Sequence, residues 1–308
     1  MEIALQFVLL ALGFVMLGKG ADWFVEGAAG IAMRFGIPQL VIGLTIVAMG
    51  TSAPEAAVSI AAAVKGNADI TIGNIVGSNI LNILVILGLA ASIVPIAVAR
   101  STVRIEIPFM IGVTALLFYQ GRDGSISLAD GGVLMVAFAA YMMYLYTMAM
   151  KSNVDSDLEE PGLPLGRCLL GAVGGLALII AGSNVTVGAA TSIATYAGLS
   201  ERFIGLTIVA LGTSLPELFT SVAAARRGNA DIAIGNIVGS NIFNILFVVG
   251  LSSLIIDIPF ASAFNFDTYV ALGAAVLLWL CVLRTQRLQR WAGALMLMCY
   301  AAYLGYIL

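Results

Sequence analysis

Two acidic residues each directly follow a proline inside a long apolar run of the sequence. Glu55 ends the stretch "GTSAPE", and Glu217 ends the similar stretch "GTSLPE". Proline has no backbone N–H, so Pro54 and Pro216 each leave the carbonyl of the residue four positions earlier without its usual helical partner. Burying a charge at the centre of an apolar layer costs about 2.5–3.5 kcal/mol on insertion scales. A carboxylate kept beside freed main-chain oxygens therefore indicates a cation-binding role.

Small and oxygen-bearing residues recur around the two acids at helical spacing. Positions three and four apart lie on one face of a helix. After each proline motif, a second motif ("GNIVGSNILN", then "GNIVGSNIFN") places a serine and an asparagine four residues apart, with glycines that permit close helix packing. The residues on these faces are Ala48, Thr51, Ser52, Glu55, Ser78 and Asn82, repeated as Ala210, Thr213, Ser214, Glu217, Ser240 and Asn244.

The polar side chains of this set offer oxygen atoms, and none offers sulfur or imidazole. Such ligands suit hard cations such as calcium, sodium or magnesium. If both acids are ionised, their charge of −2 is neutralised by one calcium ion or two sodium ions. The sequence contains no histidine, which excludes histidine proton relays and histidine metal sites. Its three cysteines are far apart, which fits neither a zinc site nor a disulfide framework.

The composition is that of an integral membrane protein. Hydrophobic residues make up 61% of the 308 residues and charged residues 10%, whereas soluble domains carry about 25% charge. Apolar runs of about 20 residues recur along the chain, each long enough to cross a hydrocarbon core of about 30 Å. In lipid such runs form helices, because backbone groups must be satisfied within the segment. The net charge of −3 indicates no nucleic-acid partner, and the lipid bilayer is the expected surrounding.

The chain contains two related halves. "GLTIVAMGTSAPE" at 43–55 recurs as "GLTIVALGTSLPE" at 205–217, and the motif beginning at 66 recurs at 228. Both pairs share one offset, since 217 − 55 = 162 and 228 − 66 = 162. The segment between the halves collects acids, prolines and glycines, as a solvated linker does. The predicted organisation is a first repeat at 1–150, a linker at 151–166 and a second repeat at 167–308.

Each half is predicted to contain five helical spans. An odd number of spans per half makes the second copy enter the membrane from the opposite side, which gives an inverted repeat. We therefore predict an all-α membrane protein of ten transmembrane helices, arranged as two inverted five-helix repeats. The predicted spans are 3–33, 38–63, 70–92, 104–120, 128–150, 166–197, 201–225, 232–255, 268–283 and 291–308.

Basic residues orient this arrangement. Ten lysines and arginines fall on the side of the linker, and three fall on the other side. Cytoplasmic loops carry the excess of basic residues. The sequence therefore predicts a multi-pass protein of the cell (inner) membrane with a cytoplasmic linker and both termini outside. Asp22 and Glu26, one turn apart in the first span, are interpreted as a water-facing polar face rather than as ligands.

The paired "GTSAPE"/"GTSLPE" and "GNIVGSN" motifs resemble the two alpha repeats of the sodium/calcium exchanger family, of the prokaryotic type, within the calcium/cation antiporter superfamily. The resemblance extends over nearly the whole chain. It implies that helices 2, 3, 7 and 8 hold ions near the membrane midplane while helices 1 and 6 slide to alternate access. The ligands that it implies are Ala48, Thr51, Ser52, Glu55, Ser78, Asn82, Ala210, Thr213, Ser214, Glu217, Ser240 and Asn244.

Two features bear on the details of that resemblance. Asn244 stands where some archaeal and potassium-dependent members have aspartate, which weakens the case for potassium co-transport. The linker is too short for the calcium-sensing domains of animal exchangers. By the same resemblance, Glu55 and Glu217 bridge the calcium site and also serve flanking sodium sites.

The expected function is extrusion of Ca²⁺ in exchange for Na⁺ by alternating access. A proton/calcium antiporter remains an alternative, because the two glutamates could carry protons, and a cation channel is a further alternative. An enzyme is not expected, because the repeated motifs contain no nucleophile and base pair. We expect no cofactor, calcium and sodium as transported ions, and function as a monomer.

Overall fold

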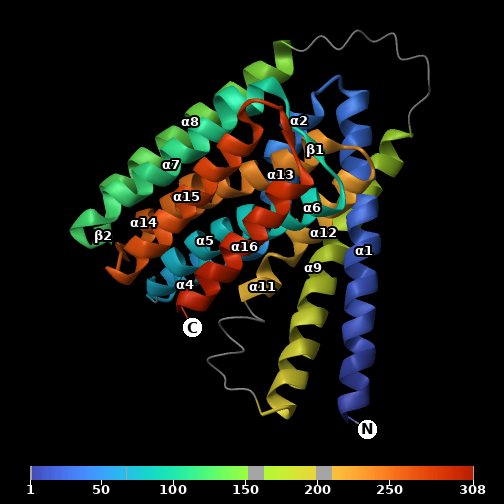
Figure 1. The fold of residues 1–308 in the computed structure, drawn as a ribbon, viewed down its shortest axis with the longest axis horizontal. Coiled ribbons are helices and arrows are strands. Elements are labelled where there is room, and N and C mark those ends of the chain that lie inside the picture. The colour runs from blue at the N-terminus through green and yellow to red at the C-terminus, as the bar shows by residue number, and fades with distance from the viewer. Residues whose placement is uncertain (1, 67, 152–162, 199–209, 308) are drawn as a thin grey trace.

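The computed structural model describes residues 2–66, 68–151, 163–198 and 210–307 (Figure 1). The described chain is helical apart from two short strand pairs. Seven of its helices are long and apolar enough to cross a membrane, or eight if one bent helix pair is counted as a single span. The protein is therefore a multi-pass, all-helical membrane protein. Most of the predicted linker, and residues 201–209 of the seventh predicted span, lie outside the described residues.

Helices in the first half begin and end near the predicted limits. The second and third ranges are each divided into several helical segments, some of them π-helical, which the sequence pattern did not predict. The elements are α1 (Glu2–Arg34), α2 (Gln39–Ile42), η1 (Gly43–Val47), α3 (Ala48–Thr51), α4 (Ala53–Val64), α5 (Asp69–Leu81), η2 (Asn82–Leu87), α6 (Gly88–Ile93), β1 (Ile96–Ala97), η3 (Thr102–Glu106), α7 (Ile107–Gln120), η4 (Gly121–Asp123), β2 (Ser125–Ile126) and α8 (Leu128–Lys151).

The second half follows the same order of elements. The helix that corresponds to the ninth predicted span, α15, begins at Ala263, five positions before the predicted start at 268. The elements are α9 (Leu165–Tyr196), α11 (Ala210–Thr213), α12 (Leu215–Arg226), α13 (Ala230–Phe243), η6 (Asn244–Val249), α14 (Gly250–Ile255), β3 (Ile258–Pro259), α15 (Ala263–Leu283), β4 (Arg287–Leu288) and α16 (Arg290–Ile307). The last helix is not among the candidate spans.

The strand pairs join the two halves at opposite ends of α7. β1 pairs with β4 and β2 pairs with β3, both antiparallel. The strands are related by the same sequence offset as the motifs: β3 begins 162 positions after β1, since 258 − 96 = 162, and β4 begins 162 positions after β2, since 287 − 125 = 162. By this offset β3 corresponds to β1 and β4 to β2, so each pair joins non-corresponding strands of the two halves, and the repeat relates one pair to the other. Between these ends α13 forms the centre of the bundle, where every residue from Ile232 to Phe243 is buried.

Helices α1 and α9 form a two-helix unit that lies side by side and extends beyond the other helices (Figure 1). Glycines allow their backbones to touch. A Cβ atom on Gly20 would lie 2.9 Å from the Gly175 carbonyl oxygen, and one on Gly175 would lie 2.5 Å from the Phe24 nitrogen. Lipid provides no hydrophobic drive for association, so this close backbone contact supplies the packing that holds the pair together. We call α1 and α9 together the α1–α9 unit.

Gly175→Ala is expected to destabilise the α1–α9 unit by about 1–3 kcal/mol, because the added methyl group meets backbone rather than a movable side chain. Gly174→Ala is the matched control, since its Cβ would meet nothing within 4 Å. Thermal unfolding in detergent measures the effect. Equal unfolding midpoints for the two variants would contradict the close contact.

Candidate ion-binding site

The second span breaks where its proline motif lies. Ser52 leaves helical geometry, with φ −81° and ψ 6°, and the segments 39–51 and 53–64 meet at a bend of 51°. Ser214 has nearly the same backbone angles, φ −91° and ψ 4°, between α11 and α12. In both copies the proline lies in the first turn of the following helix, where its missing N–H costs no hydrogen bond. Each break places the following glutamate in the first turn of a helix.

The two broken helices donate hydrogen bonds to each other's carboxylates. Ser52 Oγ lies 2.8 Å from Glu217 Oε1, and Ser214 Oγ lies 3.2 Å from Glu55 Oε1. Both glutamates are 1% exposed. Within the described residues the only ion pairs are those of Arg227, so neither carboxylate has a lysine or arginine partner there. The second oxygen of each, Oε2, is buried without a hydrogen-bond partner.

Four asparagines join α5 and η2 to α13 and η6, and these segments pack against the helices that carry the two glutamates. Asn79 and Asn241 each donate to the other's main-chain carbonyl, at 3.2 and 3.1 Å. Asn241 Oδ1 accepts a hydrogen bond from Asn82 Nδ2 at 2.9 Å, and Asn79 Oδ1 accepts one from Asn244 Nδ2 at 3.1 Å. The amide donors of Asn82 and Asn244 are thereby used, while Oδ1 of each is buried and unpaired. The network fixes each amide so that its oxygen remains available.

A second pair of asparagines supports the helices that carry the glutamates. Asn74 Nδ2 donates to Ser59 Oγ and Asn236 Nδ2 donates to Ser221 Oγ, both at 2.9 Å. Thr51 Oγ1 lies 3.0 Å from Asn236 Oδ1. The Asn74–Ser59 contact of the first half thus recurs as the Asn236–Ser221 contact of the second half, at the offset of 162 positions. They hold α5 against α4 and α13 against α12.

Glycines of the repeated motifs let the second span approach α13 closely. A Cβ atom on Gly239 would lie 2.8 Å from the Cβ of Ala48, and one on Gly235 would lie 3.1 Å from the Gly43 backbone. Ser240 Oγ, one residue further on, donates to the Ala48 carbonyl at 3.4 Å. The small residues thus bring main-chain oxygens of the broken span beside α13.

The structure places the predicted site residues as follows. Those on α3 to η2 and on α11 to η6 flank the two breaks and the asparagine network. Ser78 is buried, and Thr213 is half-buried on α11. The side chain of Ala210 lies outside the described residues. The carbonyl of Gly212, which Pro216 frees from the helix, accepts a hydrogen bond from Ser183 Oγ of α9 at 2.7 Å.

Sequence reasoning missed the supporting asparagines. Asn79 and Asn241 lie inside the "GNIVGSN" motif, yet they were not assigned a role, and neither were Asn74 and Asn236. Their repetition at the same offset was a usable signal. The role of Asn79 and Asn241 emerges only when α5 and α13 are placed side by side, because their contacts join residues of different halves. Asn74 and Asn236 instead bond to serines of their own halves.

Comparison with known proteins agrees with this architecture. The family described as "Sodium/calcium exchanger protein" matches residues 5–147 and 168–308. The chain is 41% identical over 314 residues to the putative antiporter CaxA of Alkalimonas amylolytica, covering 98% of each chain. It is 33% identical over 345 residues to the sodium/calcium exchanger MaX1 of Methanosarcina acetivorans, again covering 98% of each.

Solved structures show the same fold. A structure of the sodium-calcium exchanger NCX_Mj, soaked with Na⁺ and Sr²⁺, superposes with a TM-score of 0.87 at 34% identity. The match covers 98% of this chain and 99% of that chain. Since the family match extends through both halves, the chain belongs to the sodium/calcium exchanger family of membrane antiporters.

Proposed function

We propose that the protein exchanges Ca²⁺ for Na⁺ at a site between Glu55 and Glu217. The observation that carries this proposal is that four oxygens of the proposed ligands are buried without a hydrogen-bond partner: the Oε2 atoms of these glutamates and the Oδ1 atoms of Asn82 and Asn244. Unpaired buried oxygens cost free energy unless a ligand satisfies them. Carboxylate and amide oxygens are what calcium prefers, and sodium is a hard cation of similar preference.

The proposed ligand set is the one implied by the sequence motifs. It combines two carboxylates with neutral hydroxyl, amide and main-chain oxygens from the broken spans and from α5 and α13. Two charges match one calcium ion, so calcium and sodium compete for overlapping ligands. The proposed ligands are Ala48, Thr51, Ser52, Glu55, Ser78, Asn82, Ala210, Thr213, Ser214, Glu217, Ser240 and Asn244.

We also propose that the chain is an inverted repeat of two five-helix units, at 1–150 and 167–308, that alternates access. What supports this is the common offset of motifs, breaks and strands, together with the separate α1–α9 unit beside the remaining helices.

Location in the inner membrane is supported by the 40% identity to inner membrane protein YrbG of Escherichia coli over 80% of this chain. We propose that the linker faces the cytoplasm, that both termini lie outside, and that a monomer suffices for exchange.

Exchange of calcium for protons remains the second candidate, because the same two glutamates could bind protons. Radiocalcium uptake into sodium-loaded proteoliposomes, diluted into sodium-free buffer, separates the two candidates when it is run beside a pH-gradient control. Uptake that needs internal sodium is the expected result. Uptake driven only by the pH gradient would replace sodium by protons in the proposal.

A further inference from the structure

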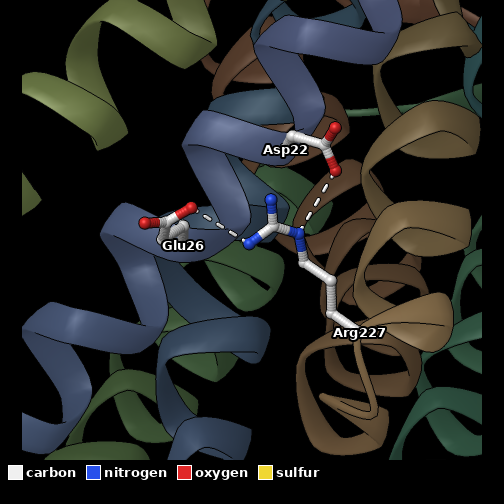
Figure 2. A network of polar contacts seen from close by, with 3 residues as sticks. All are labelled: Asp22, Glu26 and Arg227. Carbon is white, nitrogen blue, oxygen red and sulfur yellow. Dashed lines mark hydrogen bonds and ion pairs between the residues drawn. The ribbon is translucent and has the colours of Figure 1, made fainter.

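Arg227, which follows the end of α12, is joined by ion pairs to two acidic residues of α1 (Figure 2). Its Nε lies 3.2 Å from Asp22 Oδ1, and its Nη1 lies 3.1 Å from Glu26 Oε2. The two acids are one turn apart, so a single guanidinium fork spans both. Asp22 and Glu26, interpreted from the sequence as a polar face, are half-exposed and have a specific partner in the other half of the chain.

These ion pairs lie where the α1–α9 unit meets the rest of the protein. Neighbouring apolar packing between α1 and α12 is incomplete, because a crevice of about 570 Å³ opens between them, lined by residues including Phe14 and Phe219. The rings of these two residues are 6.1 Å apart. A charged contact at one end of a loosely packed interface fixes how far α1 lies along α12. Sliding α1 by one helical turn, about 5.4 Å, breaks at least one of the two ion pairs, because it brings one acid at most to the place that the other has left.

The ion pairs of Arg227 with Asp22 and Glu26 have no counterpart at the equivalent positions of the repeat. The offset of 162 places Lys65 at the position of Arg227, since 227 − 162 = 65. It places Asn184 and Gly188 at the positions of the two acids, since 22 + 162 = 184 and 26 + 162 = 188. Asn184 and Gly188 carry no charge, so neither can form an ion pair with Lys65. An inverted repeat that exchanges the conformations of its halves therefore loses the contact in the opposite state and gains no equivalent.

We propose that Arg227 is a positioning residue that favours the conformation closed on its own side of the membrane. This inference rests on the proposed alternating access. The excess of basic residues assigns that side to the cytoplasm, so the contact holds the cytoplasmic side closed and favours the outward-facing state. Half-exposed ion pairs contribute modestly, and two of them on one guanidinium bias the conformational equilibrium by about three- to tenfold.

The test is the apparent calcium affinity at each face, measured in right-side-out and inside-out vesicles. The apparent dissociation constant at a face is the intrinsic constant divided by the fraction of protein open to that face. The ratio of the cytoplasmic to the extracellular constant therefore follows the conformational equilibrium. For Arg227→Ala this ratio is expected to fall about three- to tenfold. High ionic strength is expected to lower the ratio in the wild-type protein but not in the variant.

Two controls separate this role from a general structural one. Arg226→Ala removes the neighbouring arginine, for which the described residues provide no ion-pair partner, and it should leave the ratio unchanged. Arg227→Glu combined with Asp22→Arg and Glu26→Arg reverses the charges and should restore the ratio. An unchanged or increased ratio in Arg227→Ala would overturn the proposal. Absence of sodium-driven exchange in the wild-type protein would instead overturn the proposed function.

Discussion

Glu55→Gln and Glu217→Gln are each expected to abolish sodium-driven calcium uptake. Glutamine keeps the size of the side chain and an oxygen that can accept the hydrogen bond from the serine of the opposite break. It removes one of the two charges that balance a calcium ion. Truncating one partner of a buried charge interaction costs about 2–5 kcal/mol, which corresponds to a loss of at least about 30-fold in affinity. Initial uptake rates per amount of reconstituted protein measure this loss.

Glu106→Gln is the matched control for a buried carboxylate outside the site. Glu106 is fully buried in η3 and accepts a hydrogen bond from Tyr144 of α8. Its variant should retain most of the uptake, because the residue lies outside the proposed ligand set. All three variants should remain folded and extractable in detergent, as judged by size-exclusion chromatography. Full activity in both Glu55→Gln and Glu217→Gln would refute the site assignment.

Asn79→Leu is expected to weaken apparent calcium affinity about 10- to 100-fold, although Asn79 is not among the proposed ligands. The substitution removes the acceptor for Asn244 Nδ2 and the donor to the Asn241 carbonyl. The Asn244 amide is then free to rotate, so its oxygen is no longer held ready for an ion. Residues that orient ligands typically contribute 10- to 100-fold to metal affinity. Calcium titration of sodium-free protein provides the measurement.

A positioning role and a loss of stability give different results in this titration. Thr114→Val is the control, because Thr114 is also buried and its hydroxyl bonds only to the Met110 carbonyl of its own helix among the described contacts. It should leave calcium affinity unchanged. Combining Asn79→Leu with Asn244→Leu should cost less than the sum of the two single effects, because both act on one ligand oxygen. Strict additivity would exclude the proposed coupling.

The sequence predicted the helical membrane architecture and the breaks well, because both follow from local chemistry. Long apolar runs have only one backbone solution in lipid. Proline is tolerated in the first turn of a helix but not in its interior, so Pro54 and Pro216 mark the points where each span breaks and a new helix begins. The repeated motifs also led to the correct family, since two copies at one offset form a specific pattern.

Contacts between the halves were beyond sequence reasoning. The Asn79–Asn241 pair depends on how α5 meets α13, and the sequence spacing contains no information on that crossing. The partners of Arg227 likewise lie about 200 positions away in α1. The π-helical turns beginning at Asn82 and Asn244 also have no simple sequence signature, although such turns are frequent at functional sites.

The most direct test of the ion site is anomalous diffraction from crystals soaked with Sr²⁺ at increasing Na⁺ concentrations. Strontium is a divalent stand-in for calcium. We expect a single strontium peak between the carboxylates of Glu55 and Glu217, which weakens as sodium rises and is absent in Glu55→Gln. A peak elsewhere in the bundle, or one whose height does not change with sodium, would contradict competition between calcium and sodium at this site.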